Sequence, residues 1–160
     1  RQMCIRDRYM FGDNILVAPI LNDEGIAEYY VPEGKWTDII TGKVLEGGKW
    51  YKHKCSYFEI PALAKPNSII AYGNFERQIE YDYLEGTTFT IYELEDGKSA
   101  VCPIYDTEAN KVFELTATRH GNKIECEYTD TKASFKITVA NTDKTVEIAP
   151  NFSGKVIIEL

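Results

Sequence analysis

The stretch that decides the fold is "KVFELTATR", residues 111–119, in which apolar and polar side chains alternate strictly. Phe113, Leu115 and Ala117 fall on one face of an extended chain, and the polar residues between them fall on the other. This alternation is typical of a β-strand with one face in a core and one in water. The pattern recurs in "KIECEYT" (123–129), "SFKITVA" (134–140) and "KVIIEL" (155–160). The second half is therefore predicted to form antiparallel sheets packed as a sandwich.

Turn-forming residues separate these segments. Asp96-Gly97 and Gly121-Asn122 can supply the positive φ that a tight hairpin turn requires. No stretch of ten or more residues shows a convincing helical period. The sequence therefore predicts an all-β fold.

The first half of the chain is less regular. "NILVAPIL" (14–21) is apolar on both faces, which predicts a central strand that needs cover on both sides. Residues 26–53 are predicted as strands separated by a Pro-Glu-Gly turn and a Gly-Gly loop, and residues 56–73 add two short strands. The domain boundary is predicted near Gly73-Asn74, where the sequence becomes more polar and the strand pattern clearer.

The opening segment "RQMCIRDR" fits neither a helical nor a strand period. It resembles translated sequencing-adapter read-through, so residues 1–8 are predicted to be non-native. The segment is basic, but no long apolar stretch and cleavage site follow it, so we expect no secretory signal.

Composition limits the class of partner. The net charge is -7, and nucleic acids and anionic membranes are bound through clustered Lys and Arg, so neither is an expected partner. No apolar run approaches the roughly 18 residues of a membrane helix. A neutral sugar is compatible with this charge.

The chain has four cysteines, Cys4, Cys55, Cys102 and Cys126, and none belongs to a Cys-x-x-Cys pair. With only two histidines, a zinc site is not expected. We expect free, reduced cysteines in a cytoplasmic protein.

From Tyr9 onward the chain resembles the C-terminal part of glycoside hydrolase family 31, and among its members the bacterial α-xylosidases. The motif "YMFGDNILVAPI" (9–20) resembles the signature where the family's catalytic barrel gives way to its C-terminal sheets. The segments "YVPEGKWTDIITGKVLEGGKWY" (30–51) and "FEIPALAKPNSIIAYG" (58–73) follow in the family order, and residues 71–104 resemble the xylosidase branch. Family members often have Arg-Ala-Gly where this chain reads Ala64-Lys65-Pro66-Asn67, so no role is assigned to that arginine.

The resemblance implies two β-sandwich domains, residues 9–73 and 74–160, that belong to a retaining α-glycosidase. The parent enzyme would hydrolyse terminal α-linked xylose with two aspartates of a β/α barrel and with no metal or cofactor. No segment here resembles either catalytic motif, so no catalytic, cofactor-binding or metal-binding residue is assigned. The implied partners are the barrel of the same chain, an oligosaccharide bound by the parent enzyme, and a second copy of the protein in a homo-oligomer.

Three residues are individual candidates for a functional site. Asp13 follows Gly12 beside the apolar strand; it could contact substrate at the barrel end, but a turn residue that bonds nearby amides is the favoured interpretation. His53 lies between two lysines and His120 precedes a turn, so both are predicted to be exposed. Neither is accompanied by a recognisable triad.

The aromatic residues leave one alternative open. Trp36, Trp50 and the eleven tyrosines could form a sugar-stacking platform, although positions in strands favour packing in the core. The sequon at Asn151 carries no meaning in a cytoplasmic bacterial protein. The rival hypotheses are a free-standing carbohydrate-binding module and an interaction domain. An apolar surface on the first strand would favour a domain interface, and a polar one would favour an independent module.

Overall fold

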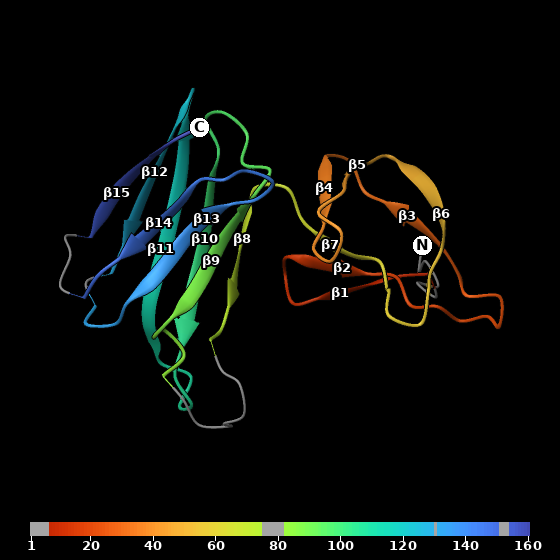
Figure 1. Ribbon diagram of the computed structural model, residues 1–160, viewed down its shortest axis with the longest axis horizontal. Helices are drawn as coiled ribbons and strands as arrows, with labels where there is room; N and C mark the ends of the chain where they lie inside the picture. Colours follow the sequence, from red (N-terminus) through yellow and green to blue (C-terminus); the bar gives the residue numbers. More distant parts are fainter. Residues whose placement is uncertain (1–6, 75–81, 130, 151–153) are drawn as a thin grey trace. The chain divides into compact units, whose positions relative to one another are not determined.

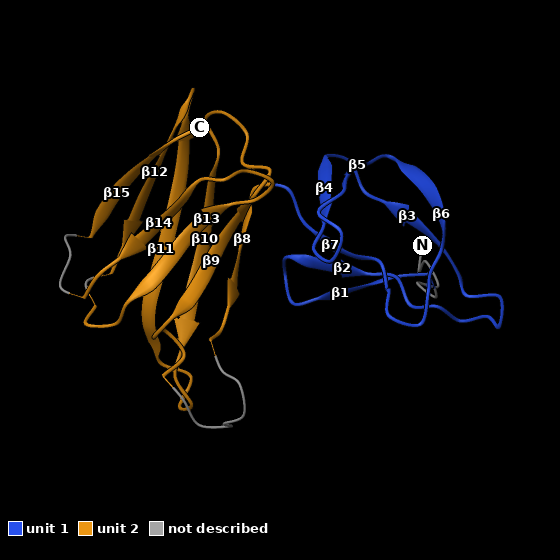
Figure 2. Ribbon diagram, viewed as in Figure 1, with its two compact units in different colours: residues 1–66 blue, residues 67–160 orange. Residues whose placement is uncertain are grey.

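The computed structural model describes residues 7–74, 82–129, 131–150 and 154–160. The chain forms two compact units, residues 1–66 and 67–160, shown in blue and orange in Figure 2. Every helix or strand assigned within the described residues is a β-strand, which confirms the all-β prediction (Figure 1). None of the described residues belongs to a helix long and apolar enough to cross a membrane.

The first unit contains a five-stranded antiparallel sheet in the order β1-β2-β7-β4-β5 and a separate antiparallel pair, β3 with β6. β2 lies between two neighbours, so the apolar segment "NILVAPIL" does contain an interior strand. The strands are β1 Tyr9–Phe11, β2 Ile15–Val17, β3 Ile26–Val31, β4 Lys35–Asp38, β5 Val44–Glu46, β6 Lys49–Lys54 and β7 Ala62–Ala64.

The core of this unit lies between the five-stranded sheet and the β3–β6 pair. Leu16, Trp36 and Leu63 face it from the sheet, and Tyr29 and Val31 face it from β3. The Trp36 indole Nε1 donates a hydrogen bond to the Pro32 carbonyl oxygen at 3.0 Å, which satisfies the polar atom of a buried ring.

Two glycine connections meet at one corner of the first unit. The Gly47 N–H donates to the Gly34 carbonyl oxygen at 2.7 Å, and the Gly48 N–H donates to the Val31 carbonyl oxygen at 2.8 Å. A Cβ atom on Gly47 would lie 1.7 Å from the Pro32 carbonyl oxygen, so only glycine fits there. The Pro-Glu-Gly turn and the Gly-Gly loop were predicted from the sequence, but their contact was not.

The second unit contains two four-stranded sheets, β10-β11-β12-β15 and β14-β13-β9-β8. Every strand pair in them is antiparallel except β9 with β13, which is parallel; the prediction of purely antiparallel sheets was wrong at this pair. The strands are β8 Ser68–Tyr72, β9 Thr87–Tyr92, β10 Ser99–Tyr105, β11 Lys111–His120, β12 Lys123–Tyr128, β13 Phe135–Val139, β14 Thr145–Ile148 and β15 Lys155–Glu159.

An aromatic cluster fills the centre of the second unit. The Phe113 ring centroid lies 5.4 Å from that of Phe89 and 5.2 Å from that of Phe135, and the Tyr128 centroid lies 5.1 Å from that of Phe135. These distances are typical of favourable aromatic packing. The four rings come from four strands of both sheets, and the buried residues of β11 and β12 are the ones that the alternation predicted.

The turns and the boundary differ in detail from the predictions. Gly121-Asn122 closes the β11–β12 hairpin as predicted, with Gly121 at φ 59°. Asp96-Gly97 instead connects β9 to β10, which belong to different sheets. The compact units divide after Pro66, before β8, because β8 pairs with β9 of the second unit; the sequence had placed β8 in the first domain. The prediction for residues 1–8 falls mainly on residues 1–6, which lie outside the described residues.

Candidate functional site

The outer face of the five-stranded sheet carries mostly apolar side chains, which are buried at its centre and exposed at its edges. Residues directly opposite each other in an antiparallel pair have side chains on the same face. The strand register therefore places Phe11, Ile15, Ala64, Thr37 and Val44 in one row across the sheet. We call this surface the outer sheet face. Its second row contains Tyr9, Val17 and Ala62.

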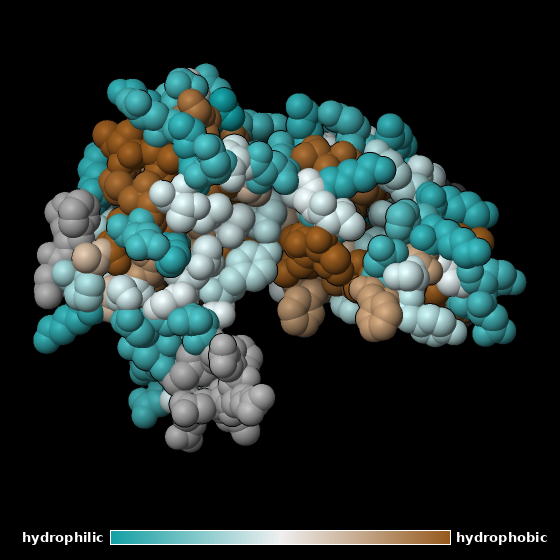
Figure 3. Space-filling view, viewed as in Figure 1, coloured by the Kyte–Doolittle hydropathy of each residue, from teal (hydrophilic) through white to brown (hydrophobic). Residues whose placement is uncertain are grey.

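The two edges of the outer sheet face are exposed. Tyr9 is 50% exposed and Phe11 66% exposed at the β1 edge, and Val44 is 40% exposed at the β5 edge. The space-filling view shows hydrophobic colours gathered over the region of β1 and β2 (Figure 3). Large exposed apolar patches mark interaction surfaces. The first strand thus has the apolar surface that favours a domain interface over an independent module.

The individual site candidates lie on three different elements. Asp13 is exposed in the turn between β1 and β2, His53 is exposed on β6, and His120 is exposed at the end of β11. The predicted exposure of both histidines is confirmed. The structure brings none of the three together into a catalytic arrangement, because they lie on different elements of two units.

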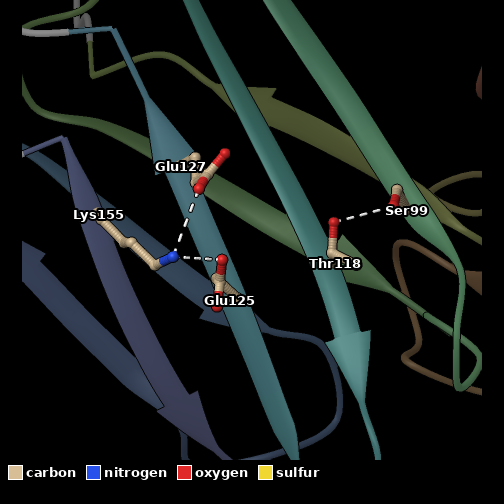
Figure 4. A network of polar contacts seen from close by, with 5 residues as sticks. All are labelled: Ser99, Thr118, Glu125, Glu127 and Lys155. Atoms are coloured by element: carbon tan, nitrogen blue, oxygen red, sulfur yellow. Dashed lines mark hydrogen bonds and ion pairs between the residues drawn. The ribbon is translucent and has the colours of Figure 1, made fainter.

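Two carboxylates of the second unit do share a partner. Glu125 and Glu127 lie on β12, and the Lys155 ammonium on β15 forms ion pairs with both (Figure 4). The hydrogen bond from Lys155 is the main reason why the pKa of Glu125 is below its ordinary value. A glycosidase acid needs the opposite, a carboxyl group whose pKa is raised. The three side chains form an exposed ion-pair network on the sheet.

The described part of the chain also offers no metal centre. Within it, no group of three or more His, Cys, Asp or Glu side chains is placed to hold a metal ion. Cys55, Cys102 and Cys126 are free and buried, which confirms the prediction for these three, whereas Cys4 lies outside the described residues. Burial raises the pKa of the Cys102 thiol to about 11 and that of Cys126 to about 12, so neither is a reactive thiolate at neutral pH.

The aromatic residues divide between core and surface. Trp36 is buried as predicted. The prediction of core packing was wrong for five exposed rings, those of Tyr9, Trp50, Tyr57, Tyr72 and Tyr105. The signal for Trp50 was present in "KWYKHK", where Trp50 has the same parity as Lys52 and Lys54 and therefore faces solvent with them. The sequon at Asn151 lies outside the described residues.

Family models match both units. Residues 2–70 match the model described as "Glycosyl hydrolase family 31 C-terminal domain", and residues 82–160 match "Alpha-xylosidase YicI, C-terminal domain". The chain carries C-terminal domains of glycoside hydrolase family 31. The resemblance read from the sequence motifs is confirmed. The catalytic domain of such family 31 enzymes is not contained in this chain.

Characterised family 31 relatives support the same assignment. The α-xylosidase XylQ of Lactiplantibacillus pentosus is 35% identical over 120 residues, and an α-xylosidase of Emericella nidulans is 43% identical over 132 residues. These matches cover 73% and 74% of this chain, but the chain spans only 16% of each relative. An α-glucosidase of Bacillus thermoamyloliquefaciens is also 35% identical, over 103 residues, 64% of this chain and 13% of that protein.

Solved structures of family 31 enzymes share the fold. A cycloalternan-forming enzyme from Listeria monocytogenes gives a TM-score of 0.77 at 20% identity, covering 96% of this chain and 18% of that one. An α-xylosidase from Xanthomonas citri gives a TM-score of 0.73 at 17% identity, covering 96% of this chain and 19% of that one.

Proposed function

We propose that this chain is the C-terminal, non-catalytic part of a retaining α-xylosidase, and that its first unit supports the catalytic barrel through the outer sheet face. The single observation that carries the docking role is the exposed apolar edge formed by Tyr9 and Phe11. The α-xylosidase relatives support the choice of substrate, although an α-glucosidase also matches the chain.

In this proposal two carboxylates of the barrel do the chemistry. One attacks the anomeric carbon, and the other protonates the leaving oxygen. The outer sheet face contributes by burying its exposed edge side chains, Tyr9, Phe11 and Val44, against the barrel, at roughly 25 cal/mol for each Å² removed from water. The substrate would be an oligosaccharide with terminal α-linked xylose. We further propose a cytoplasmic protein, in keeping with three buried free thiols, and a homo-oligomeric parent enzyme.

The test compares this chain alone with the complete reading frame from the source DNA. The isolated chain should release no nitrophenol from nitrophenyl α-xyloside, whereas the complete enzyme should, and it should prefer the xyloside to the α-glucoside. Release by the isolated chain would contradict the assignment of catalysis to the barrel. A preference for the α-glucoside would leave the proposed docking role in place and would identify an α-glucoside as the substrate.

A matched pair of variants in the complete enzyme tests the docking role. Phe11→Ser removes a ring from the outer sheet face and should lower the melting temperature of the enzyme together with its activity. Tyr105→Ser removes a ring of similar exposure from the second unit and should change neither. Equal effects of the two variants would remove the evidence for docking through this face.

A further inference from the structure

A second aromatic surface lies on the other side of the first unit. The register of β3 with β6 places Tyr30 opposite Trp50, and Glu28 opposite Lys52. These four side chains share the face of the β3–β6 pair that points away from the core, since Tyr29 and Val31 occupy the core side. We call this surface the Trp50 face.

The ring geometry of the Trp50 face leaves a stacking surface open. The Tyr30 and Trp50 ring centroids are 5.9 Å apart with an interplanar angle of 64°, an edge-to-face contact. The Arg8 guanidinium lies 5.4 Å from the Tyr30 centroid, and the Tyr30 N–H donates to Asp7 at 3.4 Å. Tyr30 is thus held on two sides, while the Trp50 side chain, 61% exposed, extends into solvent.

Polar groups and a pocket adjoin these rings. The Lys52 ammonium and the Glu28 carboxylate form an ion pair at 3.5 Å, and both line a surface pocket of ≈ 460 Å³. Glu24 adds carboxylate oxygens to the pocket, and Ile26 adds an apolar wall. The lining mixes charged and apolar side chains, and the volume of the pocket falls within the usual range of small-ligand sites.

The proposed docking of the catalytic barrel does not account for the Trp50 face. The β3–β6 pair packs with its Tyr29 side on the Leu16 side of the five-stranded sheet, and the outer sheet face is the opposite side of that sheet. The Trp50 face and the exposed edges of the outer sheet face therefore belong to opposite sides of the unit. A barrel seated on one leaves the other uncovered by that contact.

We propose that the Trp50 face binds a neutral oligosaccharide, with the Trp50 ring stacked on the apolar face of one sugar ring. The C–H groups of that sugar face are slightly positive and meet the negative face of the indole. The Glu28 carboxylate would accept hydrogen bonds from sugar hydroxyls, and the Lys52 ammonium would donate to them.

The mixed charge of the Trp50 face selects this class of ligand. An anionic ligand would meet the carboxylates of Glu24 and Glu28, and an apolar protein surface would have to desolvate the Glu28–Lys52 ion pair. A neutral glycan satisfies donors and acceptors together and covers an aromatic ring. The inference rests on the proposed function only for the choice of the first glycan to test.

The two tryptophans provide the test in the full 160-residue chain. In a spectrum of the ¹⁵N-labelled protein, the indole N–H signal of exposed Trp50 should shift on titration with an α-xylosylated gluco-oligosaccharide. The signal of Trp36, which is buried and bonded to Pro32, should stay in place. Malto- and cello-oligosaccharides are titrated in parallel, because binding of any of them supports the inference even if the parent enzyme is not an α-xylosidase.

Variants complete the test. In titration calorimetry, which does not need the Trp50 signal, Trp50→Ala should weaken binding about tenfold, the effect expected for loss of one stacked ring. Tyr57→Ala removes another exposed ring of the same unit outside the Trp50 face and should leave binding unchanged. The unshifted Trp36 signal reports that each variant is folded. The inference is overturned if millimolar glycan shifts neither indole, or if Tyr57→Ala weakens binding as much as Trp50→Ala does.

Discussion

The two units use their apolar residues differently. Among the described residues, the core cluster of the second unit contains 18 buried residues and that of the first unit 9. The large exposed hydrophobic side chains show the reverse distribution, 10 in the first unit and 5 in the second. The second unit thus buries its apolar faces within itself, whereas the first unit presents much of its apolar surface outward. Such a surface is expected of a unit that is completed by a partner.

The largest effect is expected in the centre of the second unit. Phe113→Ala removes a fully buried ring that contacts Phe89 and Phe135, and it should destabilise this unit by about 3–5 kcal/mol. Val112→Ala, at the exposed neighbouring position, should cost less than about 0.5 kcal/mol. Chemical denaturation followed by circular dichroism measures the free energy of unfolding of both variants. Circular dichroism does not depend on the tryptophans, which both lie in the first unit. Similar losses for the two variants would mean that the second unit has no well-packed core.

A somewhat smaller effect is expected at the glycine corner of the first unit. Gly47→Ala places a Cβ atom against the Pro32 carbonyl oxygen and should cost about 3 kcal/mol through overpacking and lost hydrogen bonds. Gly12→Ala meets no atom within 4 Å and only has to accept a positive φ, so about 1 kcal/mol is expected. Tryptophan fluorescence monitors this unit, since both tryptophans belong to it. If Gly12→Ala were the more damaging change, the corner would not be a tight contact.

The next effect is expected in the stability of the second unit at alkaline pH. The thiol of Cys126 has an ordinary pKa of 9.0 and a folded pKa of about 12, because burial disfavours the thiolate. Above pH 9 the unfolded state loses this proton and the folded state does not, so the stability of the second unit should fall up to pH 12. The slope is about 1.4 kcal/mol per pH unit for each such group.

Cys126→Ala should reduce that slope in the second unit, whereas Cys55→Ala, in the first unit, should not change it. Denaturation midpoints measured at a series of pH values from 8 upward would show this. An unaltered slope in Cys126→Ala would mean that this thiol is not buried as a neutral group.

The smallest effect on stability is expected at the β1 edge. In the isolated chain Phe11→Ser should change the free energy of unfolding by less than about 0.5 kcal/mol, because the ring is mostly exposed. It should instead reduce self-association, which sedimentation velocity measures directly. A large loss of stability in the isolated chain would show that Phe11 belongs to the core of the first unit and not to a surface for a partner.

How much could be predicted from the sequence also differs between the units. In β11 and β12 each side chain has one environment, so the alternation of Phe113, Leu115 and Ala117 with polar residues predicted strand, face and burial together. β6 follows the same rule, but the exposed Trp50 was expected in the core because aromatic residues usually pack there. The residue type of Trp50 was therefore a poorer guide to its exposure than its position on the strand.

The remaining errors concern pairing. The Asp96-Gly97 turn has the residues of a hairpin turn, yet β9 and β10 belong to different sheets, because turn chemistry sets the local bend and not the partner of the strand that follows. Likewise β8 is apolar enough for either unit, and only its pairing with β9 assigns it to the second. The outer sheet face depends on four register relations and could not be derived from residue types.

The parallel pairing of β9 with β13 sets an order for folding. Three strands, β10, β11 and β12, separate the partners along the chain, and these three can pair among themselves through short connections. Local contacts form faster than distant ones, so the β10–β11–β12 meander is expected to form before β9 finds β13. During synthesis β9 must wait with β8 alone until Phe135–Val139 has left the ribosome, and throughout that interval its unpaired edge can join another nascent chain.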